Sequence, residues 1–205
     1  MPSPDRRFLE HLGTLRACRL CAGVIAPPIA QPVTAGRVYL RGQAPGPREV
    51  QEGRAFCGPA GRTLFRWFAS IGVEEQVFRE RVFMGALIRC FPGKNEGGQG
   101  DRRPSRDEIG NCRAHFDREL ELLRPDLVLL VGGMAIDQLL PRRKLDEVVG
   151  RTFDLERNGQ AFTALPLPHP SGLSRWLQGE PGKSLLRQAL DLLAEQPAWR
   201  ETFGG

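Results

Sequence analysis

Two loops of this sequence carry side chains that could act together on one ligand. The first, residues 42–61, follows a short apolar stretch and is rich in glycine and proline, so its backbone N–H groups can approach a ligand closely. The second, residues 168–172, holds His169 between two prolines. An amide, a carboxylate and an aromatic ring stand in the first loop, on Gln43, Glu49 and Phe56. With backbone donors and a histidine, they suit a planar heterocycle that must be stacked and hydrogen-bonded.

Each of these residues also has an ordinary structural interpretation. His169 could cap its loop, Phe56 could pack in the core, and Glu49 could be a solvated charge. The prediction of a site depends on their convergence. Both loops follow predicted strands, and open α/β sheets bind ligands at the carboxyl ends of their strands.

Four cysteines are candidates for metal ligands. Cys18 and Cys21 form a Cys-x-x-Cys pair. Cys90 follows a predicted strand, and Cys112 falls on a predicted helix. Four thiolates could close a tetrahedral zinc site or hold an iron–sulfur cluster. The wide spacing of the second pair favours a cluster over zinc, and buried structural thiols are the alternative to both. The fifth cysteine, Cys57, is interpreted as a small packing residue.

The composition is that of a globular protein with a basic surface. The 205 residues fit one domain, expected to span 1–205, with 40% hydrophobic and 26% charged residues. Lysine and arginine number 29 against 24 acidic residues, a net charge of +5, which suits a polyanionic partner or reflects only a solvated basic surface. The sequence has no apolar run of transmembrane length and no signal-peptide segment. We therefore expect a cytoplasmic monomer with reduced thiols and no membrane partner.

The elements that must position these residues alternate along the chain. Short apolar stretches predict four strands, at 37–40, 81–88, 127–131 and 160–165. Helical spacing of apolar residues predicts five helices, at 5–17, 63–71, 107–123, 134–140 and 182–193. The charged segment 142–159 is expected to be broken and partly extended. Strands alternating with helices imply a three-layer α/β/α sandwich around a central four-stranded parallel sheet.

The loop motifs, taken together and in order, resemble the uracil-DNA glycosylase superfamily, in particular its iron–sulfur families 4 and 5. The motifs are Gly42-Gln43-Ala44-Pro45-Gly46-x-x-Glu49, Gly53-Arg54-x-Phe56-x-Gly58-x-Ala60-Gly61, Arg89-Cys90-x-Pro92 and His169-Pro170-Ser171. The resemblance implies the α/β fold already inferred and a DNA repair enzyme. Such a monofunctional glycosylase flips uracil out of DNA and hydrolyses its N-glycosidic bond, leaving an abasic site for base excision repair. It also implies a [4Fe–4S] cluster, with the ligands Cys18, Cys21, Cys90 and Cys112.

Some positions depart from the family patterns. Gln43 stands where family 4 has a glutamate, and Ala86 stands where family 4 has an asparagine that reads the base. Family 5 also has a small residue at the position of Ala86. The first motif ends in Gly46, as it does in family 4. The chain therefore lies between the two families. A related branch traps the sugar with a histidine between the third and fourth cysteines, and this segment contains no trapping histidine, so no covalent adduct is expected.

If the chain excises uracil as the resemblance implies, each of these loop residues has an expected role. His169 donates to O2 of the departing uracil, which carries the negative charge, together with backbone N–H groups near Gln43 and Ala44. Phe56 stacks on the flipped base. Glu49 steadies the sugar cation or orients water, or Gln43 orients the water instead.

The remaining contacts are with the DNA. Leu173 is placed to enter the duplex where the base leaves, although it could simply pack under its loop. Arg48, Arg102, Arg103 and Arg175 could hold phosphates. The residues expected to contact the substrate are Gly42, Gln43, Ala44, Phe56, Ala86, Ser171 and Leu173.

Two other functions are compatible with the sequence. One is a non-catalytic iron–sulfur DNA-binding protein. It would keep the cluster and the basic face, but would lack the family-4 glutamate and asparagine that Gln43 and Ala86 replace. A four-cysteine zinc protein could bind a nucleotide in the same cleft. Release of uracil from DNA separates the first interpretation from both alternatives.

Overall fold

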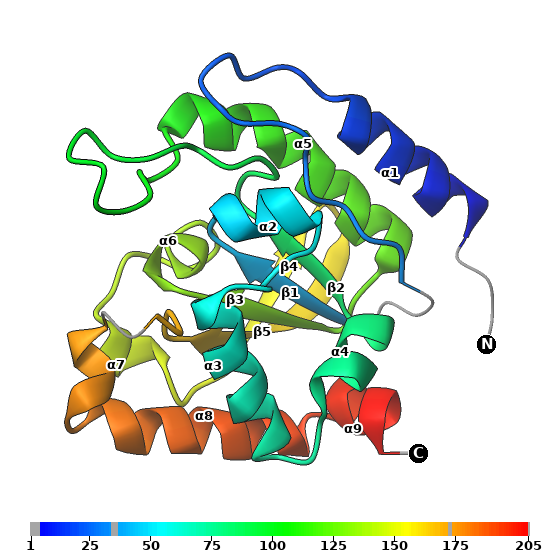
Figure 1. Ribbon diagram of the computed structural model, residues 1–205. Helices are drawn as coiled ribbons and strands as arrows, with labels where there is room; N and C mark the ends of the chain where they lie inside the picture. The colour runs from blue at the N-terminus through cyan, green and yellow to red at the C-terminus, as the bar shows by residue number, and fades with distance from the viewer. Residues whose placement is uncertain (1–4, 34–36, 172–173, 205) are drawn as a thin grey trace.

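The computed structural model describes residues 5–33, 37–171 and 174–204. A five-stranded sheet of order β2-β1-β3-β5-β4 forms the centre of the molecule (Figure 1). Its strands are β1 Val38–Gly42, β2 Phe83–Ala86, β3 Leu127–Val131, β4 Phe153–Arg157 and β5 Gln160–Leu167.

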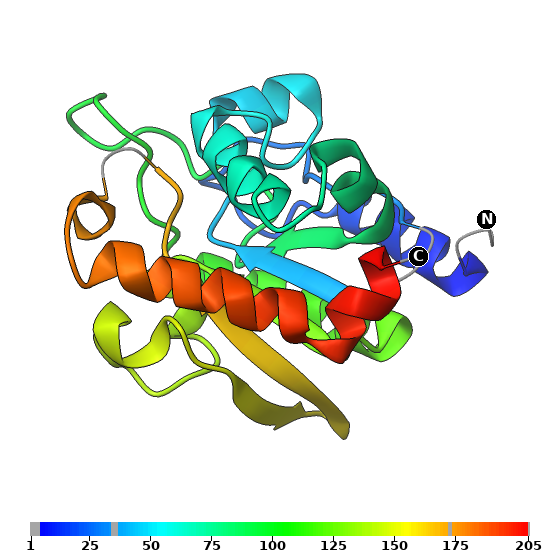
Figure 2. The ribbon, with the colours of Figure 1, turned by 90° about the horizontal axis from the view of Figure 1, so that it is seen from below.

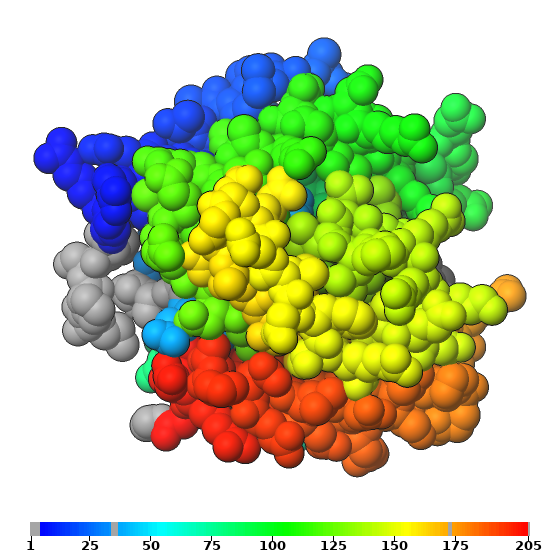
Figure 3. All heavy atoms as spheres, turned by 180° about the vertical axis from the view of Figure 1, so that it is seen from behind, coloured from blue at the N-terminus to red at the C-terminus, as the bar shows by residue number. Residues whose placement is uncertain are grey.

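The four predicted strands pair in parallel and are confirmed as β1, β2, β3 and β5. All five residues of β1 and of β3 are buried, which is why their sequences are apolar without alternation. The fifth strand, β4, is antiparallel to β5 and lies outside the four that were predicted. Residues along β4 alternate between half-buried and exposed, so this edge strand has only a weak apolar signal. Figure 3 shows this hairpin at the surface, between α5 and α8.

Helices cover both faces of the sheet, as predicted for a three-layer sandwich. In Figure 1, α1 and α5 lie on one side of the sheet while α3, α8 and α9 lie on the other. Figure 2 shows α8 and α9 running across that second face. The helices are α1 Arg6–Ala17, α2 Pro47–Glu52, α3 Pro59–Ala69, α4 Glu75–Arg81, α5 Arg106–Leu123, α6 Gly133–Ile136, α7 Leu145–Val148, the 3₁₀ helix η1 Arg175–Gln178, α8 Gly182–Glu195 and α9 Pro197–Phe203.

Aromatic side chains fill both layers of the core. On one face, the Tyr39 ring contacts Phe83 and Phe116 at centroid distances of 5.5 Å. On the other, Phe68 stacks on Phe78 at 4.5 Å. Within the described residues, no helix is long and apolar enough to cross a membrane.

Candidate active site

A cleft of about 450 Å³ opens at the carboxyl ends of the parallel strands. The chain passes from β1 outward to β2 and then crosses to β3 on the other side of β1. The strand order therefore reverses beside β1, which is where open α/β sheets bind ligands. The cleft brings together the two loops predicted to form a site. The predicted residues that line it are Gly42, Gln43, Ala44, Glu49, Phe56, Ala86 and His169.

Two predicted substrate contacts are not among the described residues that line the cleft. Ser171 lines a neighbouring groove between α3 and α8, and its backbone N–H donates to the His169 ring at the cleft. Leu173 lies outside the described residues, so its expected role as a wedge stays a prediction.

Glu49 connects the two ends of the first loop by hydrogen bonds to the backbone. Its Oε2 atom accepts a hydrogen bond from the Gly46 N–H, and its Oε1 atom accepts one from the Gly58 N–H, both at 3.1 Å. These glycines begin two successive helices, α2 and α3, because each is the residue immediately before the first helical turn. Both oxygens of the carboxylate are thus engaged by backbone donors at two helix N-termini.

Phe56 is held as a wall of the cleft. Its backbone has φ of 52°, and Arg79 fixes this conformation by donating to the Ala55 and Phe56 carbonyls at 2.7 and 2.9 Å. The ring edge rests on Gly42, where a Cβ would lie 2.9 Å from it. A Cβ on Gly61 would lie only 1.8 Å from the Phe56 carbonyl oxygen, so glycine is required there. Sequence reasoning found the glycines but not Arg79.

The ring of His169 has a defined tautomer. Its Nδ1 atom accepts a hydrogen bond from the Ser171 N–H at 3.3 Å. Burial lowers the pKa of His169 below its ordinary value, which favours the neutral ring. With Nδ1 acting as an acceptor, the single proton of the neutral ring resides on Nε2. His169 therefore presents a hydrogen-bond donor, without net charge, at the cleft.

This tautomer gives a testable result. At pH 6.5 an ordinary histidine is about half protonated. We expect His169 to remain mostly neutral at that pH, with its proton on Nε2, as measured by imidazole ¹⁵N chemical shifts. In urea, where burial and the Ser171 contact are lost, the same ring should titrate at the ordinary value. A folded-state ring that is half or more protonated at pH 6.5, or protonated on Nδ1, would contradict the assignment.

The four predicted ligand cysteines line a second cavity, of about 90 Å³. Apolar side chains of Leu15, Val24 and Ile88 close it. Burial raises the pKa of Cys90 to about 11, and the nearby thiols of the other three cysteines add to this effect. The Asn111 amide donates to the Sγ atom of Cys21 at 3.5 Å. Cys57 is not among the residues that line either cavity.

Four thiols are a donor set that either zinc or an iron–sulfur cluster can use. Among the described residues, no group of three or more histidines, cysteines or carboxylates is arranged around one ion position. An iron–sulfur cluster places its own atoms between the thiolates, so its ligand sulfurs stand further apart than those of a single tetrahedral ion. The four thiols line one largely apolar cavity.

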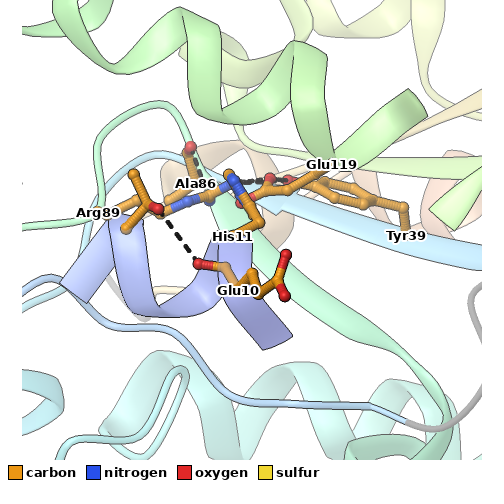
Figure 4. A network of polar contacts seen from close by, with 7 residues as sticks. Glu10, His11, Tyr39, Ala86, Arg89 and Glu119 are labelled. Carbon is orange, nitrogen blue, oxygen red and sulfur yellow. Dashed lines mark hydrogen bonds and ion pairs between the residues drawn. The ribbon is translucent and has the colours of Figure 1, made fainter. Parts of the chain in front are cut away.

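A buried polar network joins the two cavities (Figure 4). Arg89 follows β2, directly before Cys90, and is 2% exposed. Its Nη2 atom donates to the Tyr39 hydroxyl at 2.8 Å and pairs with the Glu119 carboxylate. Its Nη1 atom donates to the Ala86 carbonyl at 2.9 Å, and Arg89 lines both the cleft and the cysteine cavity.

The same network includes α1, which ends directly before Cys18, and α5, which carries Cys112. Glu119 on α5 accepts from Tyr39 at 2.6 Å and lies 3.5 Å from His11 on α1. Burial alone would raise the pKa of Glu119, but the Arg89 guanidinium, with His11 and Tyr39, lowers it below the ordinary value. A buried carboxylate needs such partners. Sequence reasoning missed this network, and its only local signal is the arginine beside Cys90.

The sheet order and the position of the cleft place the chain among open, doubly wound α/β proteins. Residues 31–194 match the family model of the uracil DNA glycosylase superfamily. The chain belongs to that superfamily, which confirms the resemblance seen in its motifs.

Relatives of both expected families are similar to this chain. A type-4 uracil-DNA glycosylase of Archaeoglobus fulgidus is 29% identical over 141 residues, which cover 66% of each protein. This match spans just under two thirds of that relative. A type-4 enzyme of Pyrobaculum aerophilum is 30% identical over 155 residues, covering 72% of this chain and 74% of the relative. A type-5 uracil-DNA glycosylase of the same organism is 26% identical over 154 residues, covering 67% and 62%.

Proposed function

We propose that this protein is a uracil-DNA glycosylase that flips uracil out of DNA and hydrolyses its N-glycosidic bond. The observation that carries the proposal is the His169 ring, half-buried at the cleft with a neutral Nε2–H donor, in the same cleft as the Phe56 ring. Flipped bases are read by stacking and by hydrogen bonds to their edges. Membership of the superfamily and the type-4 and type-5 relatives support the same activity.

The geometry suits the charge that develops in this reaction. When the C1′–N1 bond breaks, the electron pair leaves with uracil and is shared with O2. A donor fixed at Nε2 stabilises that anion without reorganisation, and such donors each contribute about 2.7–4 kcal/mol to catalysis. The backbone of Gln43 and Ala44 lines the same cleft and supplies the remaining donors. Because Glu49 is occupied at both oxygens, we assign it to holding the loop and positioning these groups.

We propose that Cys18, Cys21, Cys90 and Cys112 hold a [4Fe–4S] cluster. Bound there, the cluster supplies iron–thiolate bonds that tie the end of α1 to the segment after β2 and to α5. The Arg89 network continues from these segments to the Ala86 carbonyl at the cleft wall. The cysteine cavity therefore has a direct structural link to the base pocket. We assign the cluster a role in holding this framework.

The DNA partner is inferred from charge and from the cleft. Arg48 is exposed and lines the rim of the cleft, where a phosphate backbone would pass. Arg102, one of the arginines expected to hold phosphates, instead places its guanidinium on Glu108. We propose a cytoplasmic monomer that binds uracil-containing DNA.

We expect the protein to release other deaminated bases besides uracil. Ala86 lines the cleft, but its methyl group offers no hydrogen bond to the base and its carbonyl is engaged by Arg89. A site without a dedicated side-chain partner rejects analogues poorly. Free-base release from oligonucleotides that contain uracil, hypoxanthine, xanthine or thymine should show uracil released fastest, with measurable release of another deaminated base. Release of uracil alone would mean that a different group reads the base, and DNA binding with no release at all would favour the non-catalytic alternative.

A further inference from the structure

A short hairpin between β2 and α5 brings a second carboxylate to the cleft, that of Asp101. Residues Lys94 and Asp101 form an antiparallel bridge, and the Arg102 N–H donates to the Gly93 carbonyl at 3.0 Å. The Lys94 ammonium group donates to Asp101 Oδ1 at 2.8 Å. In Figure 1 this hairpin is the green loop that precedes α5.

Arg102 anchors the hairpin to the body of the protein. Its guanidinium contacts both oxygens of Glu108, at 2.9 and 2.5 Å, and the Gly23 carbonyl at 2.7 Å. Glu108 is itself fixed in the first turn of α5 by a reciprocal capping box with Ser105. Asp101 is therefore held from one side by Lys94 and from the other by its neighbour Arg102.

The carboxylate of Asp101 faces the part of the cleft that surrounds Gly46. Its Oδ2 atom lies 3.4 Å from the position that a Cβ on Gly46 would occupy. Among the described residues that line the cleft, Glu49 and Asp101 are the two acidic ones. Both oxygens of Glu49 accept backbone hydrogen bonds, whereas Oδ2 of Asp101 has no hydrogen-bond partner within the described part of the chain.

Solvent reaches Asp101 at this rim. Its side chain is 41% exposed, so a water molecule can bind Oδ2 from the cleft. The side-chain amide of Gln43 can orient a water but cannot take its proton. Asp101 is thus the acidic group of the cleft that has a free oxygen and access to water.

We propose that Asp101 is a catalytic residue, the general base of the hydrolysis, an inference that rests on the proposed glycosylase function. The C1′–N1 bond breaks and its electron pair leaves with uracil. The water oxygen forms a bond to C1′, and one water proton passes to Oδ2 of Asp101 and then to solvent. The ionised carboxylate also lowers the energy of the positive charge on the sugar. Lys94 holds Oδ1 of Asp101, which leaves Oδ2 on the side of the cleft next to Gly46.

The matched pair Asp101→Asn and Asp107→Asn tests this assignment. Asp107 is exposed in the first turn of α5, six positions further along, and the substitution is identical. Single-turnover uracil release should fall about a hundredfold or more in Asp101→Asn and stay at the wild-type rate in Asp107→Asn. Binding of a duplex with non-cleavable 2′-fluoro-deoxyuridine should be unchanged in both. An Asp101→Asn rate within threefold of wild type would overturn the proposal.

Chemical rescue separates a general base from a merely structural group. In Asp101→Ala, added azide should restore uracil release, because azide attacks C1′ with no proton to remove. The product strand should carry a C1′-azide, detected by mass spectrometry. The wild type and Asp107→Asn should give the ordinary abasic strand in the same azide. A loss of activity without rescue and without an azide adduct would reject the base role, whereas a wild type that releases no uracil would instead reject the proposed function.

Discussion

The His169→Ala variant is expected to release uracil at least about a hundredfold more slowly than the wild type in a single turnover. In the proposed reaction the ring donates through Nε2 to the charge that develops on O2, so its removal should cost as much as one lost oxyanion donor. This interaction acts mainly in the transition state. The affinity for uncleaved uracil DNA should therefore barely change, since phosphate contacts supply most of it.

A second histidine variant controls for this experiment. His115 lies on α5, outside the cleft, so His115→Ala should cleave at the wild-type rate. The iron content of both variants should equal that of the wild type, because neither histidine is assigned as a ligand. Cleavage by His169→Ala at a near wild-type rate would remove this ring from the mechanism.

Loss of a single ligand cysteine is expected to remove iron and destabilise the whole fold. Cys18→Ser and Cys112→Ser are the sharpest cases, because in the proposed ligand set these residues would connect α1 and α5 through the cluster. The free energy of metal binding becomes folding free energy when the site forms only in the folded chain. Iron content, the visible absorbance of the cluster and the midpoint of thermal unfolding should all fall together.

Cys57→Ser provides the matched control. Cys57 lies in the first loop, beside Phe56, and does not line the cysteine cavity. Burial, with Glu49 and Glu52 nearby, raises the pKa of its thiol to about 11, as expected for an inert packing residue. The variant should keep its iron. Loss of iron and of visible absorbance in Cys57→Ser, together with their retention in Cys112→Ser, would overturn the ligand assignment.

The parts of the fold predicted from sequence are those with a strong local pattern. β3 is buried on both faces, so five consecutive apolar residues identify it. β4 lies at the sheet edge with two of its five residues exposed, and the four-residue helices α6 and α7 are too short to establish a helical period. The predicted helix 134–140 corresponds to α6, which ends at Ile136.

Candidate site residues could be identified from the sequence where they stand in short motifs. They could not be identified where their position depends on contacts between distant segments. His169, Phe56, Cys18, Cys21 and Cys90 stand in short motifs whose residue types suggest their use, whereas Cys112 stands alone on a predicted helix. The position of Glu49 depends on the Gly58 N–H, nine residues away, and that of Asp101 on a hairpin with no sequence periodicity. Arg89 and Glu119 stand 30 residues apart in the sequence, and only the packing of α1 and α5 against the sheet shows that they are paired.

The central claim is tested most directly by the intact mass of a DNA strand that contains one uracil, measured after a single turnover with the wild-type protein. The strand should lose uracil and gain the elements of water, remain unbroken until alkali is added, and leave the mass of the protein unchanged. A strand that keeps its uracil while bound to iron-containing protein would contradict the account and identify a DNA-binding protein without glycosylase activity.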